Sequence, residues 1–202
     1  MSQIALPLDS GGAAPSRIVV GAGNRGAVEA LGHPQDWPFR TAVLLGPPRS
    51  GKSLLARWFE AQGQGEAIDG AQEWDETELF HRWNRAQEDG RPLLLVADGG
   101  AWDIALPDLA SRLGGSLQLA ITAPDDAMVA ELIAAHAEQR RLALADGAAQ
   151  YLVPRLTRSY AAIERLVAEI DRISLERKAP ATLSVWRDAL DAVEGPEQAR
   201  LL

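Results

Sequence analysis

The sequence of 202 residues contains no cysteine and only three histidines, His33, His81 and His136. The lack of cysteine excludes disulfide bridges and thiolate metal sites. The histidines lie far apart in the chain, without the short spacings that zinc sites use, and we interpret each one as a solvated helix or loop position. A histidine-based metal centre is therefore not expected.

Long apolar runs and an excess of positive charge are also missing. No run of 18 apolar residues occurs, and the N-terminus lacks the basic and apolar regions of a signal peptide, so we expect a cytoplasmic protein. Basic residues number 20 against 28 acidic ones, a net charge of −8. Strong direct binding to DNA or to an anionic membrane is therefore not expected. The apolar share of 47% suffices for one good core, with or without a small second domain.

What the sequence does contain is a complete P-loop. An apolar strand at residues 42–45 runs directly into the pattern G-x-x-x-x-G-K-S. Its glycines let backbone N–H groups face phosphates, Lys52 reaches the terminal phosphates, and Ser53 can bind Mg²⁺. A helix is predicted to open at Lys52, which adds the positive end of its dipole. The predicted nucleotide-binding residues here are Gly46, Pro47, Pro48, Arg49, Ser50, Gly51, Lys52, Ser53 and Leu54.

A P-loop protein needs a carboxylate at a strand end to hold the Mg²⁺ shell, and two residues compete for this role. Asp69 ends a very short apolar piece, whereas Asp98 ends the strongest buried-strand run of the chain, at residues 93–98. Strand strength alone favours Asp98. The residues by themselves leave both assignments open.

The remaining pattern predicts an α/β unit followed by helices only. A short helix at residues 106–113 carries Arg112, and an apolar strand follows at residues 117–122. Four helices are then expected, at residues 127–141, 147–156, 159–178 and 185–193. Asp125 or Asp126, Ser159 and Ser184 are candidate N-caps. A run of helices after an α/β unit indicates a separate helical lid.

The first 16 residues have a different character. Residues 1–8 place the Gln3 amide beside three apolar side chains, and residues 9–16 are small and suited to a flexible linker. Such a segment is either a tethered recognition peptide or, alternatively, an edge strand or a frayed tail. Residues 21–26 formally match G-x-G-x-x-G, but no acidic residue follows at the end of a second strand, so a dinucleotide site is not expected.

Several stretches together resemble the DnaA branch of the AAA+ ATPases, and most closely the Hda group of regulatory inactivators of DnaA in its small alphaproteobacterial form. Residues 3–8 (Q-I-A-L-P-L) look like the family's sliding-clamp-binding peptide. Residues 17–25 (R-I-V-V-G-A-G-N-R) are similar to the segment that wraps the adenine, and residues 106–113 (L-P-D-L-A-S-R-L) match the box with the arginine finger. The similarity covers nearly the whole chain.

The resemblance implies roles for individual residues. Arg112 becomes an arginine finger that acts in trans. Residues 78–96 look like the helix and strand after Walker B, which makes Asp69 the Walker B aspartate, holding Mg²⁺ through water, and Asp98 the sensor-1 residue. The adenine contacts fall on Val19 and Val20, and the clamp contacts on Gln3, Ile4, Leu6, Pro7 and Leu8.

Some features depart from the family pattern. Only about fifteen residues separate Lys52 from the Asp69 strand, so one strand–helix unit is expected to be missing or reduced. Gly70 stands where an acidic residue often follows Walker B, which predicts weak or no ATPase activity of its own. Ala161 occupies the sensor-2 position, and Arg158 is the nearest basic residue. No helix-turn-helix domain follows the lid, so a replication initiator itself is not expected.

The resulting expectation is a P-loop AAA+ αβα sandwich with a parallel sheet and a small all-α lid. Its predicted parts are a peptide and linker at residues 1–15, a nucleotide-binding base at 16–123 and the lid at 124–202. The implied ligands are ADP or ATP with Mg²⁺, and the implied partners are DnaA and the sliding clamp of DNA polymerase III, with self-association permitted. A small-molecule kinase or stand-alone ATPase, and a DnaA-like adaptor for other replication proteins, are the alternatives.

Overall fold

The computed structural model describes residues 2–5, 17–99 and 102–195, and of residues 2–5 the backbone only. The chain divides into two compact units. One consists of Asn24–Thr122, and the other combines Met1–Gly23 with Ala123–Leu202. The division assigns residues 17–23 to the helical unit, although they precede the sheet in the sequence.

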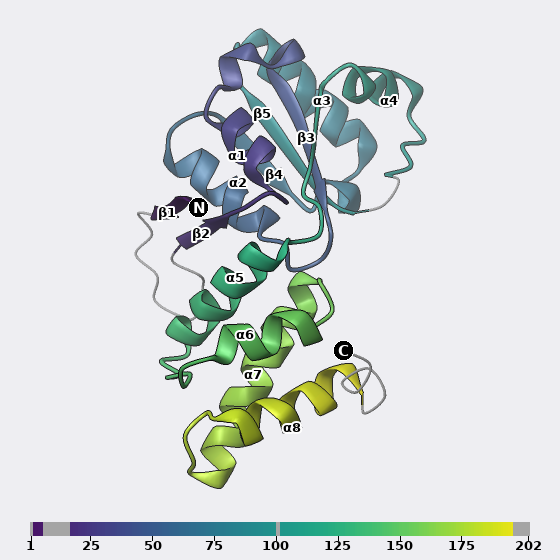
Figure 1. Ribbon diagram of the computed structural model, residues 1–202. Coiled ribbons are helices and arrows are strands. Elements are labelled where there is room, and N and C mark those ends of the chain that lie inside the picture. The colour runs from purple at the N-terminus through teal and green to yellow at the C-terminus, as the bar shows by residue number, and fades with distance from the viewer. Residues whose placement is uncertain (1, 6–16, 100–101, 196–202) are drawn as a thin grey trace. The chain divides into compact units, whose positions relative to one another are not determined.

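A four-stranded parallel sheet forms the centre of the unit Asn24–Thr122 (Figure 1). Its strands are β3 (Thr41–Gly46), β4 (Glu66–Asp69), β5 (Leu93–Asp98) and β6 (Leu117–Ala120), in the spatial order β4-β5-β3-β6. Gly46 lies opposite Asp98, and Leu45 lies opposite Ala120. Because parallel strands end at the same edge, the P-loop after β3 is bordered by the carboxyl ends of both neighbours.

Helices flank this sheet. They are α1 (Arg25–Leu31), α2 (Lys52–Ala61), α3 (Glu76–Glu88) and α4 (Pro107–Gly114), with short 3₁₀ turns η1 (Pro34–Asp36), η2 (Pro38–Arg40) and η3 (Ala71–Glu73). Alternate strand residues such as Val43, Leu93 and Leu95 pack in one buried cluster with residues of α3 and α4. Asp75 begins α3 by accepting hydrogen bonds from the N–H groups of Thr77 and Glu78.

The predicted α/β fold is confirmed in its main features. The helix after the P-loop opens at Lys52, as expected, and ends at Ala61. Only residues 62–65 separate α2 from β4, and this fully described connection contains no strand. The chain therefore passes directly from the P-loop helix α2 to strand β4, which ends in Asp69, as the short spacing predicts.

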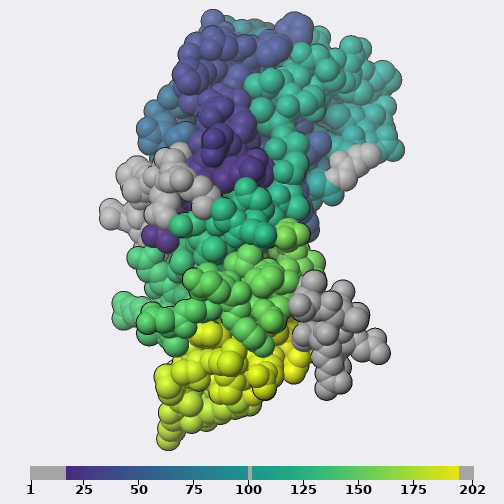
Figure 2. Space-filling model, in the orientation of Figure 1, coloured from purple at the N-terminus to yellow at the C-terminus, as the bar shows by residue number. Residues whose placement is uncertain are grey.

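Among its described residues, the second unit contains two short strands and four α-helices. Strands β1 (Ser2–Ala5) and β2 (Arg17–Val20) pair antiparallel, with Gln3 opposite Val19. The helices are α5 (Asp126–Gln139), α6 (Ala148–Leu152) with the 3₁₀ turn η4 (Val153–Arg155), α7 (Tyr160–Arg177) and α8 (Leu183–Glu194). In the space-filling view the green and yellow atoms of α6, α7 and α8 pack without a gap (Figure 2).

An apolar stripe at helical spacing along α7 forms the centre of this helical core. Its members, each at most 5% exposed, are Ile163, Leu166, Val167, Ile170 and Ile173. Of the predicted N-caps, one is confirmed with a side-chain hydrogen bond and the others are not. Asp125 caps α5 by accepting a 2.7 Å hydrogen bond from the N–H of Met128, whereas Ser159 precedes α7 without a side-chain cap bond. Thr182, not Ser184, is the N-cap of α8, because the helix begins two residues earlier than its apolar pattern indicates.

Within the described ranges, no helix combines the length and the apolar character that crossing a membrane requires.

Candidate functional site

The P-loop turns tightly between β3 and α2. Gly51 has φ 88°, a conformation that side chains other than glycine rarely adopt, which explains the second glycine of the motif. Lys52 is only 6% exposed. Its ammonium group donates to the carbonyl oxygens of Gly46 at 2.8 Å and Pro47 at 2.9 Å, and lies 3.0 Å from the Asp98 carboxylate. The lysine is thus already aimed into the loop.

Close backbone packing holds the beginning of the loop in place. The Gly99 N–H donates a 2.6 Å hydrogen bond to the Gly46 oxygen. A Cβ atom added at Gly99 would lie 2.8 Å from Gly46, and one added at Gly46 would lie 2.9 Å from the Cβ of Ile121. A side chain at Gly99 would therefore push the end of β5 away from β3, and one at Gly46 would push β3 away from Ile121, which follows β6.

Three further observations show that the loop suits a bound phosphate and its Mg²⁺. The hydroxyl group of Ser50 is buried inside the loop and has no hydrogen-bond partner among the described residues, a situation that a bound oxyanion would relieve. Ser53 lies exposed in the first turn of α2, where its hydroxyl is accessible to Mg²⁺. The ten-residue α2 also places its N-terminal N–H groups at the loop. The nucleotide and Mg²⁺ assignments to individual residues stay predictions.

The two competing carboxylates occupy different positions. Asp98 ends β5, the strand next to the P-loop strand, and pairs with Lys52. Asp69 ends β4, one strand further out, and is exposed. Gly70 follows with φ 68° and no side chain, and the carboxylate oxygen nearest to its Cβ position belongs to Glu73, at 3.9 Å. This order is compatible with Asp69 as Walker B and Asp98 as sensor 1, assignments that stay predictions.

Arg112 lies on α4 against the aromatic face of α3. Its guanidinium carbon is 4.3 Å from the centroid of a Trp83 ring and 5.0 Å from that of Phe80. Within residues 17–99 and 102–195, whose side chains the structure describes, Arg112 makes no ion pair. Six other arginines do, among them Arg158 and Arg172. Arg112 therefore keeps its charge and N–H donors uncommitted.

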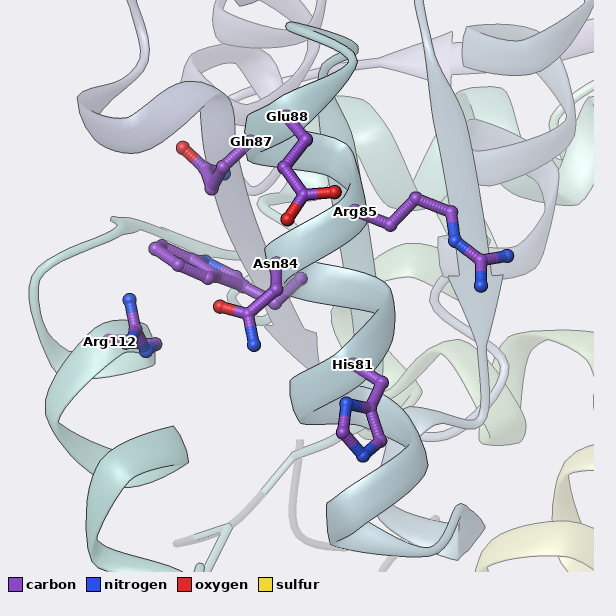
Figure 3. A pocket seen from close by; sticks show the side chains of 7 residues that line it. His81, Asn84, Arg85, Gln87, Glu88 and Arg112 are labelled. Carbon is purple, nitrogen blue, oxygen red and sulfur yellow. The ribbon is translucent and has the colours of Figure 1, made fainter.

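An open pocket of about 670 Å³ lies at this place. Figure 3 shows Arg112 of α4 on one side and Asn84, Gln87 and Glu88 of α3 on the other. His81, interpreted from the sequence as a solvated position, is exposed and also lines it. Sequence reasoning missed the contribution of Trp83, because its helical spacing reads as core. A tryptophan directly beside a polar helix face was the available signal.

The remaining predicted site residues belong to the helical unit. Val19 and Val20 are buried on β2, each 6% exposed. Arg158, just before α7, forms hydrogen bonds of 2.8 and 2.6 Å with Asp126 at the beginning of α5.

Of the predicted clamp-binding peptide, Gln3 and Ile4 lie on β1. Its other members, Leu6, Pro7 and Leu8, lie outside the described residues. The backbone of residues 2–5 has the edge-strand form that the sequence left as an alternative.

Comparisons with known proteins agree with this architecture. A family model described as "Hda, lid domain" matches residues 125–190. Domain III of the Thermotoga maritima replication initiation protein DnaA is similar with a TM-score of 0.72 and 15% identity, over 89% of this chain and 95% of that one. Residues 125–190 thus match the Hda lid family, and the chain has the fold of DnaA domain III. The resemblance stated from the sequence is thereby confirmed.

Other proteins are similar to this chain at lower TM-scores. DnaA of Aquifex aeolicus, bound to AMPPCP, has a TM-score of 0.61 and 19% identity over 80% of this chain and 67% of that one. The Holliday junction branch migration motor RuvB of Thermotoga maritima has a TM-score of 0.61 and 15% identity, over 89% and 72%. An uncharacterized Haemophilus influenzae protein is 28% identical over 129 residues, 62% of this chain, so the chain spans 55% of that curated relative's length.

Proposed function

We propose that this AAA+ protein regulates the initiation of chromosome replication by stimulating hydrolysis of ATP bound to DnaA. Arg112 supplies the arginine finger. The protein binds ADP or ATP with Mg²⁺ in its own P-loop and docks on the DNA polymerase III sliding clamp through residues 3–8. The product is DnaA carrying ADP, which restrains re-initiation.

The observation that carries the proposal is the state of Arg112. Its guanidinium lies over two ring faces, beside an open pocket, and has no carboxylate partner in the part of the chain that the structure describes. An arginine paired with a carboxylate would have to break that pair before binding a phosphate. Arg112 has no such cost, and an arginine supplied in trans to a phosphoryl transition state is worth roughly 10³ to 10⁵ in rate.

Nucleotide binding by the protein itself rests on the P-loop. The buried Lys52, the partnerless Ser50 hydroxyl and the N-terminus of α2 all converge on one loop, which suits the terminal phosphates of a nucleotide. The related DnaA of Aquifex aeolicus is known in an AMPPCP-bound form. Because Gly70 provides no carboxylate beside Asp69, we infer that the bound nucleotide is turned over slowly.

The proposal is tested by following hydrolysis of ATP pre-bound to the cognate DnaA in the presence of DNA-loaded clamp. We expect the unsubstituted protein to stimulate hydrolysis and Arg112→Ala to lose at least a hundredfold of the maximal rate, since the transition-state charge then lacks its cation. Arg112→Lys should recover only a small part, because lysine cannot reproduce the planar fork of donors.

The matched control is Arg85→Ala. Arg85 lines the same pocket and carries the same charge, but it makes no ion pair or ring contact with any described residue. Its maximal stimulated rate should stay within about twofold of the unsubstituted value, as expected of a surface charge. Absence of stimulation by the unsubstituted protein, whether loaded with ADP or ATP, would overturn the proposal.

A further inference from the structure

We propose that Trp83 is a positioning residue for Arg112. Its indole face, continued by the Phe80 ring, is a platform that holds the guanidinium at the mouth of the pocket, oriented for the phosphate of a partner's nucleotide. This inference rests on the proposed function of Arg112 and assigns to α3 a part in it.

The geometry of the pair supports a platform. The guanidinium carbon lies 4.3 Å from the Trp83 ring centroid, inside the range of about 6 Å over which a cation is attracted to a ring face. Tryptophan gives the strongest attraction of this kind, and arginine is the cation that stacks best on rings. Stacking uses the face of the guanidinium, so its N–H donors stay available for phosphate oxygens.

The platform itself is fixed by the residues packed around it. Trp83 is only 5% exposed and packs in the buried cluster with Leu109 and Leu113, one turn or less from Arg112 on α4. The Phe39 ring tilts against the indole at a centroid distance of 6.2 Å. An indole held by the core on one side and a ring on another cannot follow the arginine outward. It therefore defines where the guanidinium sits.

Hydrogen bonds to residues at and just after the end of α3 hold the backbone turn at Phe39. Phe39 and Arg40 have φ angles of 51° and 47°, which are costly for residues other than glycine and persist only where the surroundings enforce them. The Gln87 side-chain amide donates a 2.7 Å hydrogen bond to the Phe39 oxygen, and the Arg40 guanidinium donates to the Gly90 oxygen. The backbone of Phe39, whose ring contacts Trp83, is thus tied to the same helix that carries the indole.

A fixed platform matters because a free arginine samples many rotamers, and ordering it during catalysis costs free energy in the transition state. Because the Arg112 side chain is already stacked on Trp83 in the folded protein, the free-energy cost of ordering it falls on folding and not on catalysis. The role predicts a specific kinetic signature: loss of the platform lowers the maximal stimulated rate and leaves the concentration of protein needed for half-maximal stimulation almost unchanged.

The test compares Trp83→Leu with Trp83→Phe in the DnaA hydrolysis assay. We expect about a tenfold lower maximal rate for Trp83→Leu, with less than a twofold change in the half-maximal concentration, because a partly buried cation–π contact is lost. Trp83→Phe should restore most of the rate. The indole N–H has no hydrogen-bond partner in the described part of the chain, so neither variant breaks a hydrogen bond there. Trp74→Leu, at an indole that is 43% exposed, is the matched control.

A second readout reports the geometry without any activity. Ring faces shield nuclei above them, so the Arg112 side-chain NMR signals, assigned with Arg112→Lys, should be shifted upfield in the unsubstituted protein and in Trp83→Phe but not in Trp83→Leu. An upfield shift that vanishes together with the maximal rate supports the proposal.

Two results would overturn it. Loss of the upfield shift in Trp83→Leu with an unchanged maximal rate removes the positioning role while leaving the function of Arg112 intact. No stimulation by the unsubstituted protein, despite a shifted Arg112 signal, removes the function on which the role rests. The two failures are distinguished by the behaviour of the unsubstituted protein.

Discussion

At the scale of single residues, the most informative side chain of the P-loop is Lys52. It is buried, yet its charge is balanced only by Asp98 and two loop carbonyl oxygens. A phosphate entering the loop would take over these donors at little cost, since the lysine already points there. The loop is thus preorganised for an anion.

We therefore predict that Lys52→Met weakens nucleotide binding at least a hundredfold, because the terminal phosphates lose their buried cation. Binding of a fluorescent ADP analogue measures this directly. Lys178→Met is a suitable control, since it removes the same charge from an exposed position at the end of α7. Equal affinities of the two variants would contradict the assignment of the P-loop as the nucleotide site.

Tyr160 offers a second residue-scale prediction. Burial, and secondarily the nearby Asp125 carboxylate, raise the pKa of the Tyr160 hydroxyl from its ordinary value of 10.0 to about 12. The unfolded chain releases this proton at a lower pH than the folded one. The stability contribution is therefore complete below pH 10 and lost as pH rises to about 12.

The loss should amount to about 2 kcal/mol of unfolding free energy across that window. Guanidinium unfolding followed by circular dichroism at several values between pH 9 and 12 measures it. The Tyr160→Phe variant should show a flatter decline than the unsubstituted protein, with Tyr151→Phe as the control for loss of a hydroxyl. Parallel declines in all three proteins would show that Tyr160 does not titrate in this way.

At the scale of elements, local sequence patterns predicted the helices and strands well. Contacts between residues far apart in the sequence could not be predicted in this way. The run from β3 through the P-loop into α2 is encoded within twelve neighbouring residues, so it could be read directly. The apolar stripe of α7 specified its buried face for the same reason. The positions of Asp69 and Asp98 relative to the loop depend on strand order, which no local pattern contains.

Two contacts could not be predicted from the sequence, and the physical reason is the same for both. The contact of Arg112 with Trp83 joins residues on different helices, and helical periodicity alone describes the indole as core. The pairing of β1 with β2 joins segments separated by an eleven-residue stretch, and the sequence left that edge-strand form beside the free-peptide form. In each case loop closure, not propensity, decides which partner is found.

The β1–β2 pairing leads to a prediction for this element. A peptide that binds the clamp in an extended form cannot simultaneously remain paired with β2, so clamp binding should require β1 to leave. The cysteine-free chain allows a clean test, because Ser2 lies opposite Val20 and paired strand positions have separations that a disulfide can span. Ser2→Cys combined with Val20→Cys should lose clamp binding when oxidised.

Reduction of that variant should restore clamp binding to the level of the unsubstituted protein, measured by surface plasmon resonance on immobilised clamp. Each single cysteine variant controls for the substitutions themselves. Full binding by the oxidised form would show that the peptide does not need to leave β2, or does not bind the clamp at all. The fraction cross-linked is checked by mass spectrometry.

At the scale of the whole molecule, the proposal separates two tasks: a tethered peptide gives local concentration, and Arg112 gives chemistry. With a net charge of −8, the protein as a whole carries no excess of positive charge that would attract it to DNA. Holding both it and DnaA on one DNA-bound assembly can raise the effective concentration to about the millimolar range. The two tasks should therefore fail in different ways.

We predict that the combined substitution of Gln3→Ala and Leu8→Ala shifts the concentration for half-maximal stimulation of DnaA upward, by a factor on the order of 10². The maximal rate should be retained, because the side chains of Arg112 and its platform are unchanged. Arg112→Ala should show the opposite behaviour, a low maximal rate with clamp binding intact. Titration of each variant in the DnaA hydrolysis assay, with and without clamp, measures both quantities. If the peptide variant instead lost the maximal rate at saturating protein, the clamp contact would be part of the catalytic assembly and not a tether, since added concentration compensates only for lost local concentration.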